Sequence, residues 1–218
     1  SALPLEMALD FGKHHPCAVF RQVSSVGQVR YLGGILGQQL YLDDFCDIVL
    51  RFRANWFPGA NIRECCDPAG TVDTSHGTHG AYQTLHAKGI RPQSIPDSNS
   101  PAMRLAAVER HAAQMRKRAA DRNEAFVVSN SDRWLRISEQ STVVDRFLAD
   151  GFEAGYVWDV HTVSVNNKQV RKPKKDGWYE HGQNCAEYLE LNFGAEPKKE
   201  KKAQQPYRPP SGPQGWMG

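Results

Sequence analysis

The chain is predicted to fold as an α/β domain with a mixed sheet, in which three antiparallel strands are followed by parallel strands and helices flank the sheet. Three apolar segments separated by short polar breaks open the chain, a pattern typical of antiparallel hairpins. From residue 41 onward, stretches with helical spacing alternate with short apolar segments. Hydrophobic residues make up 40% of the 218 residues, which is enough for one core of ordinary size.

Three strands are expected at the start of the chain, over residues 5–11, 17–23 and 29–36. The first strand is apolar except for Glu6 and Asp10. The breaks that follow the first two strands are short and contain Gly or Pro. Consecutive strands joined in this way are expected to pair as antiparallel neighbours.

The next part of the chain is expected to alternate helices and strands. A helix over residues 41–56 would be capped by Asp43 or Asp44 and ended by the Pro58-Gly59 pair. A short strand over 61–66, a helix over 80–88 and a weak strand over 90–95 follow. Gly89 is expected just after the second helix, where a left-handed residue commonly stands.

A long helix is expected after Ser100, which would be its N-cap, with Pro101 as its first residue. It would run to about residue 120 through Met103, Ala107, His111 and Met115. The later elements are expected to be a strand over 125–129, a helix over 139–148, a small hairpin of 156–158 with 163–165, and a last helix over 178–193.

The resulting order of elements is that of an RNase H-like sheet. Residues 1–194 are expected to form that one domain. From about residue 195 the chain becomes rich in Lys, Pro, Gln and Gly, so residues 195–218 are expected to be a disordered tail.

The composition also argues against several classes of protein. The five cysteines are odd in number and irregular in spacing, which indicates buried free thiols rather than disulfides or a zinc site. No apolar run reaches the ~18–20 residues of a membrane helix. The N-terminus has no basic stretch before an apolar one, so no signal peptide is expected.

Two aspartates stand where the predicted topology brings strand ends together. Asp10 lies inside an otherwise apolar strand, and Asp67 directly follows the fourth strand. If the first and fourth strands are parallel neighbours, their carboxyl ends lie side by side and the two carboxylates converge. Such a pair repels itself unless a divalent cation lies between the two. Mg²⁺ suits a site of one or two carboxylates, water and phosphate oxygens. Each Asp alone is equally well explained as a solvated strand-end or turn residue.

The residues around these aspartates resemble a known family. Segments 8–12 (ALDFG), 67–70 (DPAG) and 178–189 (WYEHGQNCAEYL) look like the nuclease domain of tailed-phage large terminase subunits, and the resemblance runs from about residue 5 to 193. It implies an RNase H-like fold and DNA cleavage with two Mg²⁺ or Mn²⁺ ions. It also implies action with a packaging ATPase domain, a small terminase subunit and a portal. The chain has no GxxxxGK[ST] phosphate loop of such an ATPase.

Position 184 departs from the family pattern, which has a third acidic metal ligand where this chain has Asn184. Four explanations stay open. Asn184 is a natural ligand through its amide oxygen, another group such as His181 or Asp176 takes the role, the residue was changed to silence cutting, or it simply caps or packs on the last helix. His181 shares a helix face with Asn184 and is predicted to protonate the leaving group or touch a phosphate. A satisfied, partly buried histidine is the alternative.

Four lysines are predicted to contact DNA phosphates. Lys13 follows Asp10 in the chain, and Lys172, Lys174 and Lys175 precede the last helix. A further basic cluster is formed by residues 116–118, and the net charge is +3. For such clusters a solvated surface is the usual explanation.

The sequence therefore predicts a metal-dependent DNA endonuclease that cuts concatemeric viral DNA during genome packaging in the host cytoplasm. Its catalytic residues would be Asp10, Asp67 and His181, and its metal ligands Asp10, Asp67 and Asn184. Two alternatives remain: a non-catalytic module that grips or docks DNA, and a nuclease of the same fold that acts on junctions or RNA–DNA hybrids.

Overall fold

The structure is a computed structural model that describes residues 3–12, 15–25, 29–71, 80–95, 100–123, 135–137, 147–152, 158–165, 168–175 and 178–194. The strands are β1 (Leu5–Asp10), β2 (Cys17–Val23), β3 (Val29–Leu36), β4 (Ile62–Cys66), β5 (Leu135–Ile137), β6 (Trp158–Val165) and β7 (Lys168–Pro173). The helices are α1 (Leu42–Trp56), η1 (Pro68–Thr71), α2 (Ala81–Ala87), α3 (Pro101–Asp121), α4 (Phe147–Asp150) and α5 (Tyr179–Phe193).

The main sheet has five strands in the order β4-β1-β2-β3-β5. The strands β1, β2 and β3 pair antiparallel in sequence, and β4 pairs with β1 in parallel. The short β5 adds a parallel strand beside β3. The predicted mixed sheet, with three antiparallel strands followed by parallel ones, is confirmed.

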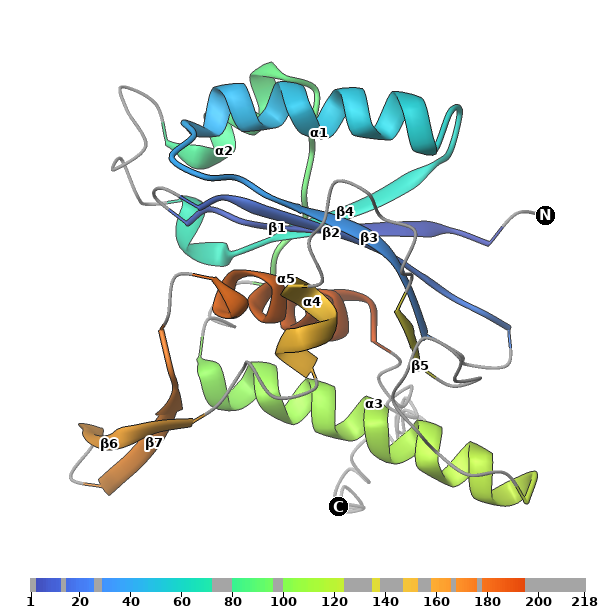
Figure 1. The fold of residues 1–218 in the computed structure, drawn as a ribbon, viewed down its shortest axis with the longest axis vertical. Coiled ribbons are helices and arrows are strands. Elements are labelled where there is room, and N and C mark those ends of the chain that lie inside the picture. The colour runs from blue at the N-terminus through green and yellow to red at the C-terminus, as the bar shows by residue number, and fades with distance from the viewer. Residues whose placement is uncertain are drawn as a thin grey trace, which may run out of the picture.

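Helices cover both faces of this sheet (Figure 1). The helices α1 and α2 lie on one face, α5 and α4 lie on the other, and α3 forms a further layer outside α5. Successive side chains of β1 point to opposite faces of the sheet. Met7 and Leu9 belong to the core on the α1 side, and Ala8 belongs to the core on the α5 side. Asp10 has the same parity as Ala8, so its side chain is directed at α5.

Most of the predicted element bounds before residue 123 are close to the observed ones. Gly89 has a φ of +79°, as expected for a residue just after a helix. The predicted cap of the first helix is wrong, because Tyr41 is the N-cap and makes no side-chain cap bond. Asp43 and Asp44 instead lie in the first turn, where acidic side chains favour the helix dipole.

The predicted long helix is present as α3, and its buried face includes three of the four residues named for it. Ala107, His111 and Met115 are buried, but Met103 is 47% exposed. Arg104 takes the buried position in its place, at 9% exposure. It does so because its charge and its hydrogen-bonding groups meet partners on α5, as described below.

The later elements differ more from the prediction. The hairpin is formed by β6 with β7, where Val163 pairs with Val170 and Val165 pairs with Lys168. The charged side chains of β7 hide its strand character from a search for apolar alternation. The predicted weak strand over 90–95 is reduced to one parallel bridge between Gln93 and Cys65. The predicted strand 125–129, residues 139–146 of the predicted helix 139–148, and the predicted tail 195–218 lie outside the described residues. The last two residues of that predicted helix belong to α4.

All five cysteines are buried free thiols, as predicted. The adjacent Cys65 and Cys66 belong to the cores on opposite faces of the sheet. No helix in the described part of the chain is long and apolar enough to span a membrane.

Candidate functional site

The two predicted aspartates lie at the same edge of the sheet. Asp10 ends β1 and Asp67 directly follows β4. The last register pair of these parallel strands is Leu9 with Cys66, and the Asp67 N–H donates to the Leu9 carbonyl at 3.3 Å. Asp10 is only 7% exposed, and Asp67 is partly buried. The predicted convergence of the two side chains is thus present, and it follows from the parallel pairing of β1 with β4.

The first two turns of α5 bring two further predicted residues to Asp10. The Asn184 side-chain amide donates from Nδ2 to the Asp10 Oδ2 at 2.9 Å. The His181 Nδ1 lies 3.2 Å from the same oxygen, and its Nε2 lies 3.7 Å from a carboxylate oxygen of Glu180. Since a carboxylate can only accept, the amide group of Asn184 must present its NH₂ side to Asp10. Asn184 is therefore a direct partner of Asp10.

Gly12 permits the close approach of the loop after β1 to His181. A Cβ placed on Gly12 would lie 2.5 Å from the His181 Cε1 and 2.6 Å from the His15 carbonyl oxygen. Real Cβ atoms do not come so close to other heavy atoms. Any side chain at position 12 would therefore push the imidazole of His181 away from Asp10.

The surroundings of Asp67 disfavour the ionised form of its carboxyl. Burial raises the pKa of the Asp67 carboxyl above its ordinary value, and the charge of Asp10 raises it further. Hydrogen bonds from the Ala69 N–H, at 2.8 Å, and from the Tyr188 hydroxyl act in the opposite direction, as does the charge of Arg104. Burial also raises the pKa of Tyr188, as do the charges of Asp10 and Asp67, so the tyrosine stays a neutral donor.

Behind Tyr188 stands Arg104 of α3. The Arg104 Nη1 donates to the Tyr188 hydroxyl oxygen at 2.8 Å, and its Nε lies 3.2 Å from a carboxylate oxygen of Glu187. The guanidinium also lies 5.1 Å from the centre of the Tyr188 ring. A chain of contacts thus leads from α3 through α5 to Asp67.

The donor set fits a divalent cation with oxygen ligands. Two carboxylates meet at one sheet edge, and the groups that contact them are an amide, an imidazole, a hydroxyl and a backbone N–H. Mg²⁺ binds through one or two carboxylates with water and substrate oxygens completing its shell. Within the described residues there is no cluster of three or more His, Cys, Asp or Glu side chains arranged for a metal. A cation here would depend on Asp10 and Asp67.

Comparison with known proteins gives a fold assignment. No family model matches the chain, and no curated protein matches it. Among solved structures, the P22 large terminase nuclease domain superposes with a TM-score of 0.52 at 11% identity, over 87% of this chain and 80% of that one. The Mn-bound nuclease domain of the large terminase g2p from bacteriophage SPP1 gives 0.46 at 13% identity, over 85% and 84%. The chain has the fold of a terminase nuclease domain. The resemblance noted in the sequence is confirmed at this level.

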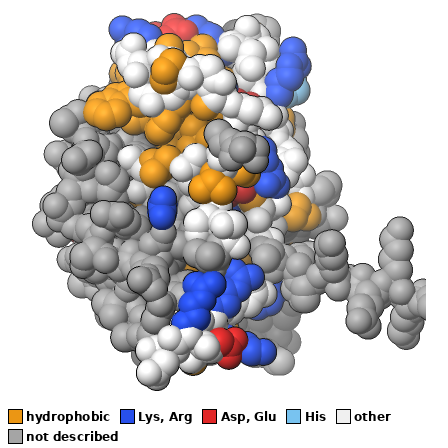
Figure 2. Space-filling view, turned by 90° about the vertical axis from the view of Figure 1, so that its right-hand side faces the viewer, with side chains coloured by type: hydrophobic (Ala, Val, Ile, Leu, Met, Phe, Trp, Pro, Cys, Tyr) orange, Lys and Arg blue, Asp and Glu red, His pale blue; other side chains and the backbone are white. Residues whose placement is uncertain are grey.

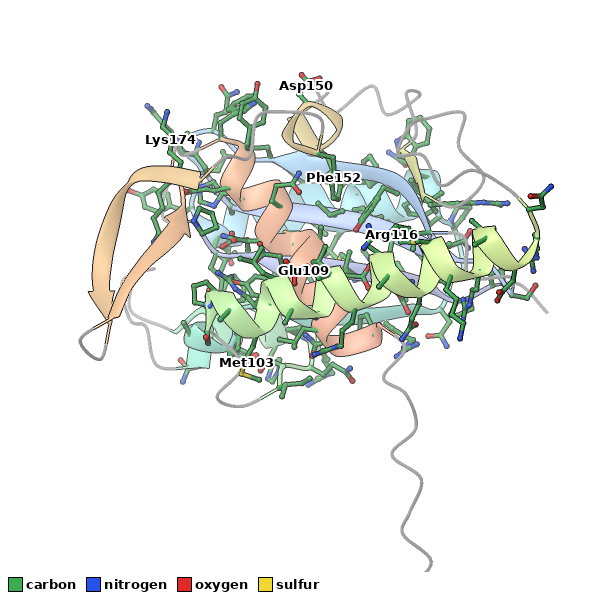
Figure 3. The ribbon with its side chains drawn as sticks, turned by 90° about the horizontal axis from the view of Figure 1, so that it is seen from below. Met103, Glu109, Arg116, Asp150, Phe152 and Lys174 are labelled. Atoms are coloured by element: carbon green, nitrogen blue, oxygen red, sulfur yellow. The ribbon has the colours of Figure 1, made fainter. Side chains whose placement is uncertain are left out.

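In this terminase-nuclease fold, the predicted DNA-contacting lysines are only partly described. Lys174 and Lys175 are exposed and follow β7. Figure 3 shows Lys174 close to the start of α5, the helix end that contacts Asp10. Lys172 lies in β7, but its side chain is outside the described set, and Lys13 and Asp176 are outside the described residues altogether.

The basic cluster 116–118 is not at this site. Its residues are exposed near the end of α3. In Figure 1 this end of α3 is opposite the end of the sheet where β1 and β4 finish. Figure 2 looks at that opposite side and shows Lys and Arg gathered at its lower edge, below an area of hydrophobic side chains.

Sequence reasoning missed three residues of the neighbourhood. Tyr188 hydrogen-bonds Asp67, Arg104 contacts the Tyr188 hydroxyl, and His15 lies with its ring centre 6.2 Å from that of His181. One signal was available for Arg104, which has the same helical spacing as the buried Ala107 and His111. Nothing in the sequence pairs Arg104 with Tyr188, since 84 residues separate the two.

Proposed function

We propose that the chain is a divalent-metal-dependent DNA endonuclease of the phage packaging machinery, which acts in the host cytoplasm. One observation carries this proposal: the Asp10 and Asp67 carboxylates meet at the ends of two parallel strands, and the nearest described cation, Arg104, contacts the Tyr188 hydroxyl and acts on Asp67 through its charge. Structural buried carboxylates are normally paired with a cation. The fold of the P22 terminase nuclease domain supports the class of reaction as an analogy.

Asp10 and Asp67 would hold one or two Mg²⁺ or Mn²⁺ ions. A bound pair of such ions would activate a water and stabilise the leaving oxygen of a phosphodiester. Asn184 would keep Asp10 oriented through its amide N–H, or join the metal shell through its amide oxygen. His181, next to Asp10, would carry the proton that the leaving oxygen receives.

Lys174 and Lys175 would contact the DNA backbone beside the site, together with Lys13 and Lys172. Such contacts do not depend on base sequence. Double-stranded DNA is the proposed substrate, and the packaging ATPase, small terminase subunit and portal are the proposed partners by analogy.

The test is nicking of supercoiled plasmid in Mn²⁺ by the intact chain, by Asp10→Asn and by Asp67→Asn. Both variants should lose at least about 100-fold in rate, as expected when a group that holds the catalytic ion is removed. Asp47→Asn is the matched control, since Asp47 is a carboxylate that pairs with Lys88 on the surface. Equal cutting by all four proteins would contradict the proposal.

A second candidate is a DNA-gripping module without cleavage. The hydrogen bond from Asn184 to Asp10 favours it, because the amide satisfies an oxygen that a metal would otherwise bind. This function predicts salt-sensitive DNA binding and no nicking in any metal. Nicking that appears only in Asn184→Asp would favour it over the first.

A further inference from the structure

A line of buried contacts connects α3 with the Asp67 carboxylate. Tyr188, on the inner side of α5, is 1% exposed, and its hydroxyl donates a hydrogen bond to Asp67. The same hydroxyl oxygen accepts a hydrogen bond from Arg104 at 2.8 Å. The Tyr188 hydroxyl therefore donates one hydrogen bond and accepts another, and the two bonds together fix the direction of its O–H.

Arg104 is itself held in place. Its Nε lies 3.2 Å from Glu187, which is 2% exposed and stands one residue before Tyr188 on α5. Its guanidinium also approaches the face of the Tyr188 ring, with 5.1 Å to the ring centre. Figure 3 shows α3 crossing beneath α5, the arrangement that lets one arginine reach both side chains.

Asp67 is a carboxylate with few fixed partners of its own. It lies between β4 and η1, and its Oδ1 accepts from the Ala69 N–H at 2.8 Å. The Tyr188 hydroxyl donates a second hydrogen bond to this carboxylate. A side chain with one hydrogen bond can still rotate about its Cβ, whereas two bonds from different elements define the plane of the carboxylate.

We propose that Tyr188 and Arg104 are positioning residues that set the orientation of Asp67 for metal binding, so that the seating of α3 on α5 controls metal affinity. The inference rests on the proposed function, because Asp67 is the carboxylate that would hold the ion and Tyr188 and Arg104 would orient it. Groups that orient a metal ligand typically change affinity about 10–100-fold when they are removed.

The structure offers a closely matched control in Tyr31. It is a second buried tyrosine, at 3% exposure, whose hydroxyl also meets an arginine, Arg21. Its place on β3 is away from Asp67. Replacing either tyrosine with Phe removes one hydroxyl from a buried site, but only Tyr188→Phe removes a hydrogen bond to Asp67.

The experiment measures the Mn²⁺ dissociation constant by titration calorimetry, with thermal unfolding in the absence of metal as a check of folding. Tyr188→Phe should weaken Mn²⁺ binding about 10-fold, and Tyr31→Phe should change it less than about twofold. Arg104→Lys should weaken binding in the intact chain and have no further effect in Tyr188→Phe, because Arg104 acts through the hydroxyl. This non-additivity separates positioning from simple destabilisation.

Two results would overturn the proposal: equal weakening by the two tyrosine variants, or an additive effect of Arg104→Lys. Asp67→Asn distinguishes failure of this inference from failure of the proposed function. If Asp67→Asn loses Mn²⁺ binding while Tyr188→Phe binds like the intact chain, only the positioning role is wrong. If Asp67→Asn binds Mn²⁺ as tightly as the intact chain, the metal site itself is wrong.

Discussion

Two buried polar clusters lie at opposite ends of β1, on the face of the sheet that α5 covers. At the start of the strand, Glu6 meets the Arg21 Nε at 2.8 Å, and Arg21 also binds Glu190 of α5. At the end of the strand, Asp10 and Asp67 meet Asn184, His181 and Tyr188. The Arg21 guanidinium pairs directly with both carboxylates of the first cluster. In the second, Arg104 acts on Asp67 through its charge and through the Tyr188 hydroxyl.

Under the proposed function, the first cluster stabilises the fold and the second binds a metal ion. Arg21 is fully buried and also donates to the Leu189 carbonyl at 2.9 Å, so its positive charge is fixed between two acids. In the Asp10–Asp67 pair burial and mutual repulsion raise the pKa of Asp67. A metal cation bound from solution would neutralise the charges of Asp10 and Asp67, as Arg21 neutralises those of Glu6 and Glu190 at the start of β1.

The largest effect is expected from Arg21→Met, which would leave Glu6 and Glu190 buried without their shared cation. The free energy of unfolding should fall by about 3–5 kcal/mol, as measured by urea denaturation. The control is Arg63→Met, because Arg63 also pairs with Glu6 but is 48% exposed, and it should cost about 1 kcal/mol or less. A loss below 1 kcal/mol for Arg21→Met would remove the distinction between the two clusters.

The next effect is expected from Asn184→Asp. Without metal, it replaces an N–H donor to Asp10 with a third carboxylate, so unfolding should become easier by about 1–3 kcal/mol. With Mn²⁺ present the added ligand should reverse the sign, and the metal-induced rise in Tm should exceed that of the intact chain. Thermal unfolding with and without Mn²⁺ measures both. Equal Tm shifts in the two proteins would place Asn184 outside the metal shell.

A smaller, pH-dependent effect is expected at Glu190. Burial raises the pKa of this carboxyl, but Arg21 and the hydrogen bond with His111 outweigh burial and lower the pKa below its ordinary 4.5. The folded state therefore holds its charge more strongly than the unfolded chain does. The resulting stability is present above about pH 4.5 and is lost as the pH falls through the lower folded-state value, by at most about 1.4 kcal/mol per pH unit.

Glu190→Gln should flatten this acid limb of the stability curve, as measured by urea unfolding between pH 3 and 6, a range of about three units. Glu109→Gln, at an exposed position of α3, should leave the limb unchanged. An unchanged acid limb in Glu190→Gln would show that other carboxylates control it.

The smallest effect on stability, and the one of opposite sign, is expected from Asp67→Asn. The raised pKa of Asp67 means that the unfolded chain loses this proton first, so stability falls as the pH rises from 3.8 through the higher folded-state value. At neutral pH the metal-free variant should thus be as stable as the intact chain or slightly more so. Its Tm should no longer rise with Mn²⁺. A clear loss of metal-free stability would make Asp67 a structural residue.

The order of elements was accessible from the sequence because the first strands and the α1 and α5 helices have strong periodic patterns. The convergence of Asp10 with Asp67 followed from the parallel pairing that this order requires. The hairpin of β6 with β7 was not accessible, since β7 is a charged strand whose pairing depends on its partner. Arg104 was also missed, because its helical spacing with Ala107 and His111 gives its place on the buried face but not its partners on α5.

The most direct test of the account is a crystal of the intact chain soaked in Mn²⁺. We expect anomalous density between Asp10 and Asp67, at about 2–2.5 Å from an oxygen of each, with Asn184 or a water completing the shell. Mn²⁺ bound elsewhere in the crystal, with no density between these two carboxylates, would contradict it.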